Sequence, residues 1–418
     1  MKKLILLSAT LLFVFIANAQ IVNIPDANFK AYLVGNSSIN TNMDAEIQVS
    51  EANSFTGTIN VLNDSISDLT GIEAFTALTY LSCENNQLSI LDVSNNTALT
   101  NLICQYNQLT SLDVSHNTAL TNLFCDHNQL TSLDVSYNTV LTNLSCGYNQ
   151  LTSLNVSYNT ALVSLNCSGS QLTSLDVSYN TALEGLACAQ NPLTSLDVSN
   201  NTALITLNCS YSLVTSLNIP NNDSLISLSC YGNQLTSLDI SNAPSLTTLK
   251  CYNNQLTYLD VTNNIELIHL VIGSATCGSN DLSCLDISQN TLLEDIQICD
   301  MTTLNEVCVW ELPFPPTGVL AETTGSPNIY YTTDCNCTNN IANTSIEKSK
   351  INIYPNPTSG LIAIEAKEIE SIEIIDLHGK QIYTGKETEI DLSNNPKGMY
   401  IIKIITDKQT ITRKLIKQ

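Results

Sequence analysis

The chain has 418 residues and an acidic composition, with 38 Asp and Glu against 15 Lys and Arg, which gives a formal net charge of −23 at pH 7. Such a charge argues against a nucleic-acid partner and favours a cationic one for electrostatic binding. After the N-terminal leader no apolar stretch is long enough to cross a membrane, so we expect no membrane-spanning segment in the mature chain.

Residues 1–19 have the pattern of a secretory signal peptide. Two lysines precede an apolar run from Leu4 to Ile16, and small residues follow before Gln20, where cleavage is expected. The run is shorter than the roughly 20 residues of a membrane-spanning helix. The sequence therefore predicts an exported protein.

Residues 20–77 are predicted to form an N-terminal cap that begins with a short helix over Asp26–Val34. The segment that follows this helix resembles a calcium-binding EF-hand loop in its spacing of oxygen-bearing side chains. The resemblance implies calcium ligands at Asn40, Asn42, Asp44, Glu46 and Glu51. Ala45 replaces the glycine that the sharp turn of such loops requires, and Asn40 replaces the usual Asp. The alternative is a loop that serves only as a cap.

Residues 78–292 repeat with a fixed period of about 21 residues, and a period of this length is typical of a solenoid. The repeated cysteines are Cys83, Cys104, Cys125, Cys146, Cys167, Cys188, Cys209, Cys230 and Cys251. In a solenoid each unit buries its apolar face against its neighbours. Each unit contains two half-repeats with apolar residues at alternate positions, which predicts two short parallel strands per coil. The asparagines between the strands are expected to bond nearby backbone groups and close the turns.

The segment Leu99–Asn107, with the pattern Leu-x-x-Leu-x-Cys-x-x-Asn, resembles a leucine-rich repeat in which Cys occupies one leucine position. It is most similar to the bacterial class that has a nested half-repeat within each repeat unit. The resemblance covers over half the chain and implies a mostly β leucine-rich repeat solenoid. It bears on fold more than on function, because one fold hosts many functions.

Three interpretations of the nine repeated cysteines stay open. They can be small buried apolar side chains, since free Cys is among the most buried residue types. Export favours disulfides between neighbouring coils, but stacked inward side chains meet disulfide geometry poorly. A metal or redox role lacks the accompanying histidines or C-x-x-C spacing. Disulfides of open pairing are expected instead among the remaining six cysteines, which are Cys277, Cys284, Cys299, Cys308, Cys335 and Cys337.

Residues 293–340 are predicted to cap the other end of the solenoid, because three prolines after Trp310 stop strand pairing. Residues 341–350 are polar and lack aromatic residues, which is typical of a linker. The charge changes at the same place. Lys30 and Lys250 are the only bases between residues 20 and 347, whereas 11 basic residues follow.

Residues 351–418 contain several short strands separated by turns, which predicts a small C-terminal β-sandwich. The motifs Tyr354–Pro357 and Gly398–Tyr400, with a basic end at Arg413, resemble the type A sorting domain of the type IX secretion system. The resemblance implies contact between residues 351–418 and the type IX secretion machinery of a Bacteroidetes-type bacterium. It also implies transport across the outer membrane, followed by release or by attachment to the outer cell surface.

The two half-repeats differ in their outward side chains. In the second half the outward line is a nearly uniform ladder of Asp flanked by Thr and Ser, as at Asp113 and Asp134. Carboxylates one strand spacing apart repel, so they must be hydrated, hydrogen-bonded to nearby groups or bridged by cations. In the first half the outward positions vary between coils. We therefore expect the variable half to carry any binding surface.

Two groups on this variable half are candidate ligand-binding residues. The first comprises Ile103, Phe124, Tyr106, His127 and Tyr148, and the second includes Tyr231 and Tyr252. Tyrosine is favoured in interfaces, because its ring adds contact area at a low cost in entropy. The alternative is that these tyrosines only cover turns, as Tyr137, Tyr158 and Tyr179 in the uniform half suggest.

The chain contains four histidines and a single arginine, so the sequence offers no convergent set of catalytic groups. We expect no enzymatic activity and no obligatory cofactor. The sequence predicts a secreted or surface-attached binding protein that recognises a protein ligand through the variable half of its repeats. The alternatives are a glycan-binding module, using tyrosine rings and asparagines, and a purely structural surface protein.

Overall fold

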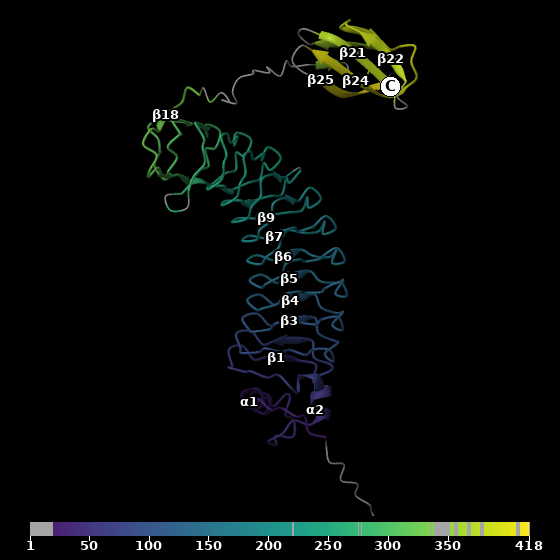
Figure 1. Cartoon of the computed structure of the whole chain (residues 1–418), viewed down its shortest axis with the longest axis vertical. Coiled ribbons are helices and arrows are strands. Elements are labelled where there is room, and N and C mark those ends of the chain that lie inside the picture. The colour runs from purple at the N-terminus through teal and green to yellow at the C-terminus, as the bar shows by residue number, and fades with distance from the viewer. Residues whose placement is uncertain are drawn as a thin grey trace, which may run out of the picture. The chain divides into compact units, whose positions relative to one another are not determined.

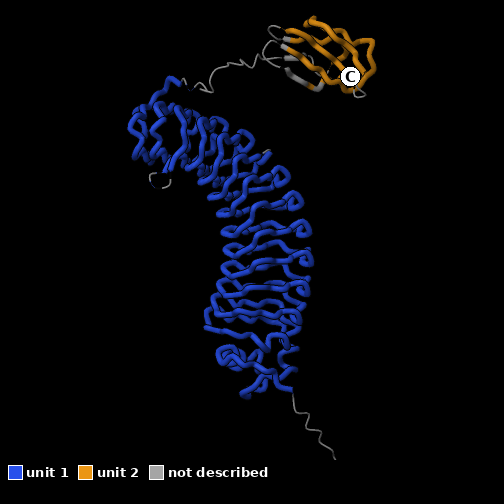
Figure 2. The backbone as a smooth tube through the Cα atoms, viewed as in Figure 1, with its two compact units in different colours: residues 1–337 blue, residues 338–418 orange. Residues whose placement is uncertain are grey.

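The computed structural model describes residues 20–219, 221–274, 276, 278–335, 337, 352–354, 358–365, 369–376, 380–406 and 410–417 (Figure 1). The expected signal peptide, the linker at 341–350 and Cys277 lie outside the described residues. The chain divides into unit 1, Met1–Cys337, and unit 2, Thr338–Gln418 (Figure 2). Each unit has its own apolar core, so each is described by itself.

Unit 1 begins with the cap, which contains the helices α1 (Ala27–Gly35) and α2 (Val49–Ser54). The carboxylate of Asp26 accepts hydrogen bonds from the backbone N–H groups of Asn28 at 2.9 Å and Phe29 at 3.1 Å, and so caps the start of α1. Phe29 and Leu33 are fully buried. Helix α1 therefore covers the apolar end of the solenoid.

The rest of unit 1 is a curved stack of coils built on one parallel sheet of 13 strands. The strands are β1 (Thr58–Asn60), β2 (Tyr80–Ser82), β3 (Asn101–Ile103), β4 (Asn122–Phe124), β5 (Asn143–Ser145), β6 (Ser164–Asn166), β7 (Gly185–Ala187), β9 (Thr206–Asn208), β11 (Ser227–Ser229), β12 (Thr248–Lys250), β13 (His269–Gly273), β15 (Asp295–Ile298) and β17 (Leu320–Glu322). From β2 to β13, each strand pairs in register with the residues of the next coil, as Leu102 does with Leu123. The predicted repeat and the β-solenoid are thus confirmed.

The second half-repeat forms strands only in a few coils, although the sequence predicts one in every coil. Strand β8 (Leu196–Asp197) pairs with β10 (Leu217–Asn218), and near the C-terminal end β14 (Cys284–Asp286), β16 (Glu306–Cys308) and β18 (Tyr330–Thr332) form a small parallel sheet. Elsewhere the half-repeat runs without strand pairing. There the Ser115 N–H donates to the Asp113 carboxylate two residues earlier, at 2.9 Å. The Ser199 N–H makes the same bond to Asp197 of β8, at 2.9 Å, so this contact accompanies the half-repeat with or without strand pairing.

The nine repeated cysteines line the core as free thiols and are fully buried. This confirms the interpretation as small buried side chains, and none of the nine forms a disulfide with a neighbouring coil. Burial raises the pKa of the thiols of Cys83, Cys167, Cys209 and Cys251 to about 12. A thiol that stays protonated is a poor nucleophile and a poor metal ligand.

We therefore expect the nine thiols to be silent toward a thiol reagent such as Ellman's reagent at pH 8 and to react once the solenoid is unfolded in denaturant. The pKa of these thiols in the folded protein lies above the ordinary value of 9.0. As the pH rises, the thiols of the unfolded chain therefore lose their protons before those of the folded chain. Stability should then be fully present below about pH 9 and fall as pH rises toward 12. Denaturant midpoints measured at pH 8 and pH 10 check the sign. Full labelling without unfolding would contradict the burial.

Two ladders of asparagines close the corners of the coils, as the sequence predicts. The side-chain amide of Asn107 donates to the carbonyl oxygens of Cys83 at 2.9 Å and Cys104 at 3.1 Å. Its own carbonyl oxygen accepts from the Leu88 N–H at 3.0 Å. On the opposite side, the amide of Asn117 donates to the Val93 and Asn96 carbonyls, each at 2.9 Å. These side chains pair backbone groups that burial would otherwise leave unsatisfied.

Two disulfides tie the last coils of unit 1 together. They join Cys284 to Cys337 and Cys308 to Cys335, which settles two of the pairings left open by the sequence. Cys299 is buried. The ring of Phe314 packs edge-on against Trp310, with centroids 5.2 Å apart, and covers the end of the core. The C-terminal cap is therefore held by covalent links and aromatic packing.

Unit 2 is formed by two antiparallel sheets, as expected for a small β-sandwich. One sheet contains β19 (Asn352–Tyr354), β20 (Leu361–Glu365) and β23 (Glu389–Asp391), and the other contains β21 (Ile369–Asp376), β22 (Gln381–Gly385), β24 (Gly398–Thr406) and β25 (Thr410–Lys417). Its core includes the buried side chains of Ile362, Ile374 and Ile402. Across the described parts of both units, we find no helix long and apolar enough to span a membrane.

Candidate binding surface on the variable half of the repeats

Three aromatic side chains stack along the ends of strands β3, β4 and β5. The ring centroids of Tyr106 and His127 lie 4.2 Å apart with planes inclined by 10°, and those of His127 and Tyr148 lie 4.3 Å apart with planes inclined by 6°. About half of the surface of Tyr106 and Tyr148 stays exposed, at 48% and 44%. The structure thus brings together three of the residues that the sequence singles out, in a continuous and accessible row.

The three residues occupy a backbone position that is unfavourable for them. Tyr106, His127 and Tyr148 have positive φ angles of 54°, 52° and 50°. Gly169 and Gly232 hold the same position in other coils, where a left-handed backbone has no steric penalty. Left-handed geometry costs about 1–2 kcal/mol for a residue with a Cβ. Gln190 and Tyr211 adopt the same conformation, with φ angles of 55° and 51°, so the left-handed turn belongs to the repeat, and what sets these coils apart is the run of three aromatic residues.

The row of rings ends at Tyr148, because the equivalent residue of the next coil is Gly169, which has no side chain. A Cβ atom placed on Gly169 would lie 2.6 Å from Cδ1 of Tyr148, so the Tyr148 ring rests against bare backbone. Any larger residue at 169 would push this ring aside. Gly169 therefore keeps the orientation of the last ring in the row.

An apolar pair lies beside the stack. Ile103 and Phe124 lie side by side, in register, on the neighbouring strands β3 and β4, and both are half-buried. The equivalent residue on β5 is Ser145, so the apolar surface ends there. We call Ile103, Phe124, Tyr106, His127 and Tyr148 together the variable-face patch.

A buried carboxylate under this patch was missed by sequence reasoning. The Oδ1 atom of Asp126 accepts hydrogen bonds from the Gly147 N–H at 3.1 Å, from the Asn166 side-chain amide at 3.3 Å and from the Ser145 hydroxyl. Asp126 is only 7% exposed. It links three consecutive coils directly below the stack. The equivalent residues of the next two coils are Gly147 and Ser168, and this change of residue type was the sign of a special role for Asp126 that the sequence offered.

The second predicted group, Tyr231 and Tyr252, forms a smaller stack near the other end of the sheet. Their ring centroids lie 4.4 Å apart with planes inclined by 9°, and the Tyr211 ring meets Tyr231 edge-on at 5.0 Å. Several coils separate this group from the variable-face patch along the sequence. The two aromatic groups are therefore separate surfaces.

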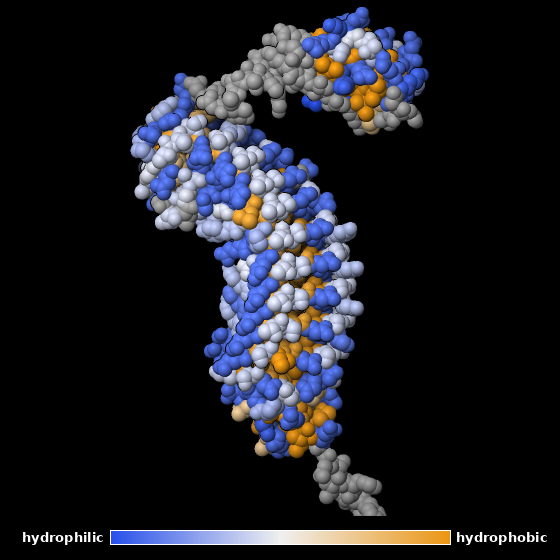
Figure 3. All heavy atoms as spheres, in the orientation of Figure 1, coloured by the Kyte–Doolittle hydropathy of each residue, from blue (hydrophilic) through white to orange (hydrophobic). Residues whose placement is uncertain are grey.

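The tyrosines of the uniform half are more exposed than those of the variable-face patch. Tyr137, Tyr158 and Tyr179 are 58–60% exposed, so they cover little of the turns beneath them. The Asp ladder beside them is hydrogen-bonded, and the Ser115 N–H lowers the pKa of the Asp113 carboxyl. Figure 3 shows polar and apolar residues in columns that run along the stack from one coil to the next, as this repetition requires.

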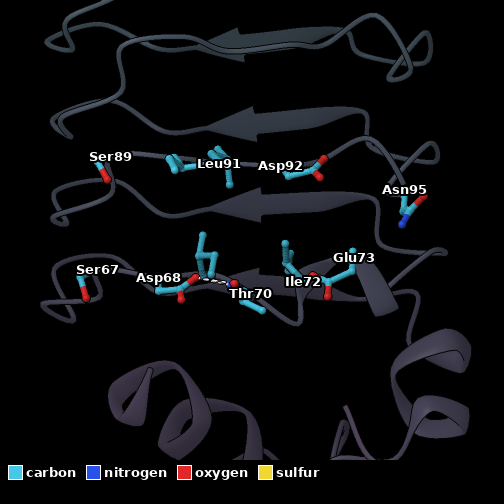
Figure 4. Close-up of a pocket in the computed structure, with 11 residues that line it drawn as sticks. Ser67, Asp68, Thr70, Ile72, Glu73, Ser89, Leu91, Asp92 and Asn95 are labelled. Carbon is cyan, nitrogen blue, oxygen red and sulfur yellow. Dashed lines mark hydrogen bonds between the residues drawn. The ribbon is translucent and has the colours of Figure 1, made fainter. Parts of the chain in front are cut away.

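A hollow near the N-terminal cap collects three carboxylates. Asp68, Glu73 and Asp92 line it between the irregular first coil and the first regular one (Figure 4). Asp68 accepts from the Thr70 N–H at 2.8 Å, and Glu73 accepts from the Gly71 N–H at 2.7 Å. These contacts are turn-forming bonds within the chain, so the cluster serves the local backbone.

Most predicted ligand atoms of the loop that resembles an EF-hand are bonded within the protein, whereas the buried side-chain oxygen of Asn40 has no hydrogen-bond partner among the described residues. Glu46 forms an ion pair with Lys30 at 2.7 Å. The Glu51 carboxylate accepts from the N–H groups of Thr41 at 2.8 Å and Gln48 at 3.0 Å, which makes it the cap of α2. The Asn40 amide nitrogen, which cannot bind a cation, donates to the Asp44 carbonyl at 2.8 Å. A calcium ion takes six to eight oxygen ligands, so its binding here would have to displace these contacts of Glu46 and Glu51.

We accordingly expect a calcium chelator to leave the melting temperature of the protein unchanged. Glu51→Gln turns one of the two acceptor oxygens into an N–H donor that faces another N–H group, so it should lower stability by about 1 kcal/mol. Differential scanning fluorimetry with calcium and with chelator measures both effects. A rise in melting temperature on adding calcium, abolished by Glu51→Gln, would instead establish the site that the sequence pattern implies.

The geometry just described defines a leucine-rich repeat protein. A family model for the secretion system C-terminal sorting domain matches residues 352–418. Unit 2 is therefore a sorting domain of the type IX secretion system, and it indicates export of the protein to the cell surface or into the medium.

Two solved structures are similar to the chain. The functional domain of InlJ from Listeria monocytogenes, which includes a cysteine ladder, is 28% identical with a TM-score of 0.65, and the match covers 96% of this chain and 100% of that one. The internalin InlF from the same organism is 19% identical with a TM-score of 0.55, covering 75% of this chain and 96% of that one. No curated protein matches the chain. The solenoid thus has the fold of internalins.

Proposed function

We propose that this protein is an exported, non-catalytic binding protein that recognises a protein ligand with the variable-face patch. The observation that carries the proposal is the stack of Tyr106, His127 and Tyr148, held at backbone positions where glycine would be less strained. The stack stands beside the only outward apolar pair formed by adjacent coils among the strands β2–β12, Ile103 and Phe124. Repeats that served architecture alone would not need either feature.

The composition of the patch supports a protein ligand. Aromatic side chains dominate the buried centres of protein interfaces, and a polar rim surrounds them. Here the rim includes Asn122 and Asn143, whose side chains bond each other at 2.7 Å across β4 and β5. The surrounding solenoid is strongly acidic, so a partner with a basic rim around an apolar anchor would be complementary.

His116 and His127 support a role without catalysis. His127 lies between two tyrosine rings in the stack. His116 is exposed on the uniform half, 3.2 Å from the Ser115 hydroxyl, away from the patch. Neither sits in a concave site with converging acid and base groups, which an enzyme requires.

The proposal is tested with variants that the chain itself suggests. Asn occupies the left-handed position at Asn85 and Asn253, and Ser occupies the Phe124 position on β5, so Tyr106→Asn, Tyr148→Asn and Phe124→Ser should fold normally. Binding of the chain from Gln20 onward is measured on an array of extracellular proteins. Loss of hot-spot side chains should weaken the specific interaction by about 30-fold or more.

Tyr158→Asn on the uniform half is the matched control and should bind like the wild type. Equal binding by the patch variants and the wild type would refute the proposal, as would a loss caused by Tyr158→Asn alone. Absence of any specific protein ligand would favour a purely structural surface protein.

A further inference from the structure

A second concave surface lies over strands β12, β13 and β15, away from the variable-face patch. It is a hollow of about 470 Å³, within the usual range for small-ligand sites. We call it the β13 hollow. Its lining residues are Tyr231, Thr248, Lys250, Tyr252, His269, Val271, Ser274, Asp295 and Gln297.

The bottom of the hollow is formed by a short side chain that lies between two longer ones. On the central strand β13 the floor is Val271, which is only 6% exposed. Lys250 pairs with Val271 on one side, and Gln297 pairs with it on the other, so both long side chains flank a short one. In the neighbouring row, His269 lies between Thr248 and Asp295. The short side chain of Val271 thus leaves room for the cavity.

One wall of the hollow is aromatic. The rings of Tyr231 and Tyr252 stack 4.4 Å apart and line the cavity together. In the next coil the chain departs from the repeat at Gly273 and Ser274, which place no ring beside the two tyrosines. A flat ligand can therefore lie against this wall.

The polar groups around the floor include both donors and acceptors. The Asp295 carboxylate accepts from the Gln297 amide at 3.4 Å and lies 4.0 Å from Nδ1 of His269. Lys250 is the only cation in the regular coils, and no acidic group lies within ion-pair distance of it among the described residues. Lys30, the only other Lys or Arg between residues 20 and 347, is paired with Glu46.

We propose that the β13 hollow binds a single pyranose ring of a neutral glycan. A pyranose has one apolar C–H face, which suits the tyrosine wall, and a rim of hydroxyl groups. Lys250 and Gln297 donate hydrogen bonds to these hydroxyls, and Asp295 accepts from them. The proposal is independent of the protein-binding function, because the two surfaces share no residue.

The charges favour a neutral sugar over an acidic one. The lining of the hollow contains one Lys, Lys250, and one carboxylate, Asp295, so it carries no net formal charge. The chain as a whole carries a formal charge of −23, which opposes an anionic ligand. A peptide is less suited, because the floor and rim are polar at every position except Val271, and hydroxyl groups match such a surface better than apolar side chains do.

The test uses saturation-transfer NMR and calorimetric titration of the chain from Gln20 onward. The probes are the methyl pyranosides of glucose, galactose, mannose and N-acetylglucosamine, with the glucuronide, the galacturonide and trialanine for comparison. We expect at least one neutral pyranoside to bind, with transfer strongest at its ring C–H protons. Lys250→Ser and Tyr252→Ser should each weaken it about tenfold or more, as removal of a charged hydrogen bond or an aromatic contact does.

Both substitutions are matched to the chain, since Ser229 holds the Lys250 position one coil earlier and Ser210 holds the Tyr252 position two coils earlier. Thermal unfolding confirms that each variant is folded. Phe124→Ser should leave sugar binding unchanged, which separates this site from the variable-face patch. The proposal is overturned if no neutral pyranoside binds, if binding survives both hollow substitutions, or if a uronide or trialanine binds more tightly.

Discussion

Deletion of residues 352–418 should leave nearly all of the protein inside the cell. These residues are the sorting domain that the family model matches, and they form a unit with its own core, separate from the solenoid. Removing them therefore takes away the export determinant without exposing the core of unit 1. Immunoblots of the medium, the cell surface and the periplasm, combined with protease shaving of intact cells, measure the distribution.

The matched control for this deletion is the full chain carrying Tyr158→Asn, which alters only an exposed side chain of the uniform half. It should reach the outside as the wild type does. If the truncated chain appeared at the surface or in the medium in wild-type amounts, export would depend on a signal elsewhere in the protein.

The second large effect concerns the asparagine ladder beneath the variable-face patch. The amide of Asn128 donates to the carbonyls of Cys104 at 3.0 Å and Cys125 at 3.1 Å, and its oxygen accepts from the Leu109 N–H at 2.9 Å. Asn128→Ala would leave these buried groups without partners, at about 1–3 kcal/mol each. We expect a total loss of about 3 kcal/mol or more, which is a large fraction of the stability of most domains.

Gln129→Ala, at the neighbouring exposed position, is the control and should change stability by less than about 0.5 kcal/mol. Urea unfolding gives the overall effect. Amide hydrogen exchange of the coils around Asn128 gives the local one, because coils of a solenoid can open separately. Equal stability of the two variants would show that the ladder is not what holds the corners.

The fold could be predicted because every buried position recurs at the same spacing. Leu102 and Leu123 hold the same position in successive repeats of the sequence and lie side by side in the sheet. The asparagine corners follow from the same regularity. A second strand was predicted in every coil but forms in only a few, and the bond from a Ser N–H to the Asp two residues earlier does not distinguish them, because Asp113 and Asp197 both accept it. Disulfide pairing also escaped prediction, since it depends on the irregular path of the C-terminal cap.

The candidate site, like the fold, could be predicted only in part. The stack of Tyr106, His127 and Tyr148 follows from the repeat, but its left-handed backbone and its packing against Gly169 do not. The β13 hollow was missed for a clear reason. An insertion separates β13 from β15, so His269 and Asp295 are neighbours in the sheet although their separation in the sequence breaks the regular period. The calcium pattern stays a prediction, since residue types alone do not show which atoms are already bonded, as those of Glu46 and Glu51 are.

The claim that the variable-face patch is the recognition surface is tested most directly by site-specific photo-crosslinking. A benzophenone amino acid replaces Phe124 in one variant and Tyr158 in another, and each is irradiated with the protein ligand found on the array. We predict an adduct from position 124, suppressed by an excess of the unlabelled wild-type chain, and none from position 158. An adduct from position 158 alone, or equal adducts from both, would contradict the assignment of the patch.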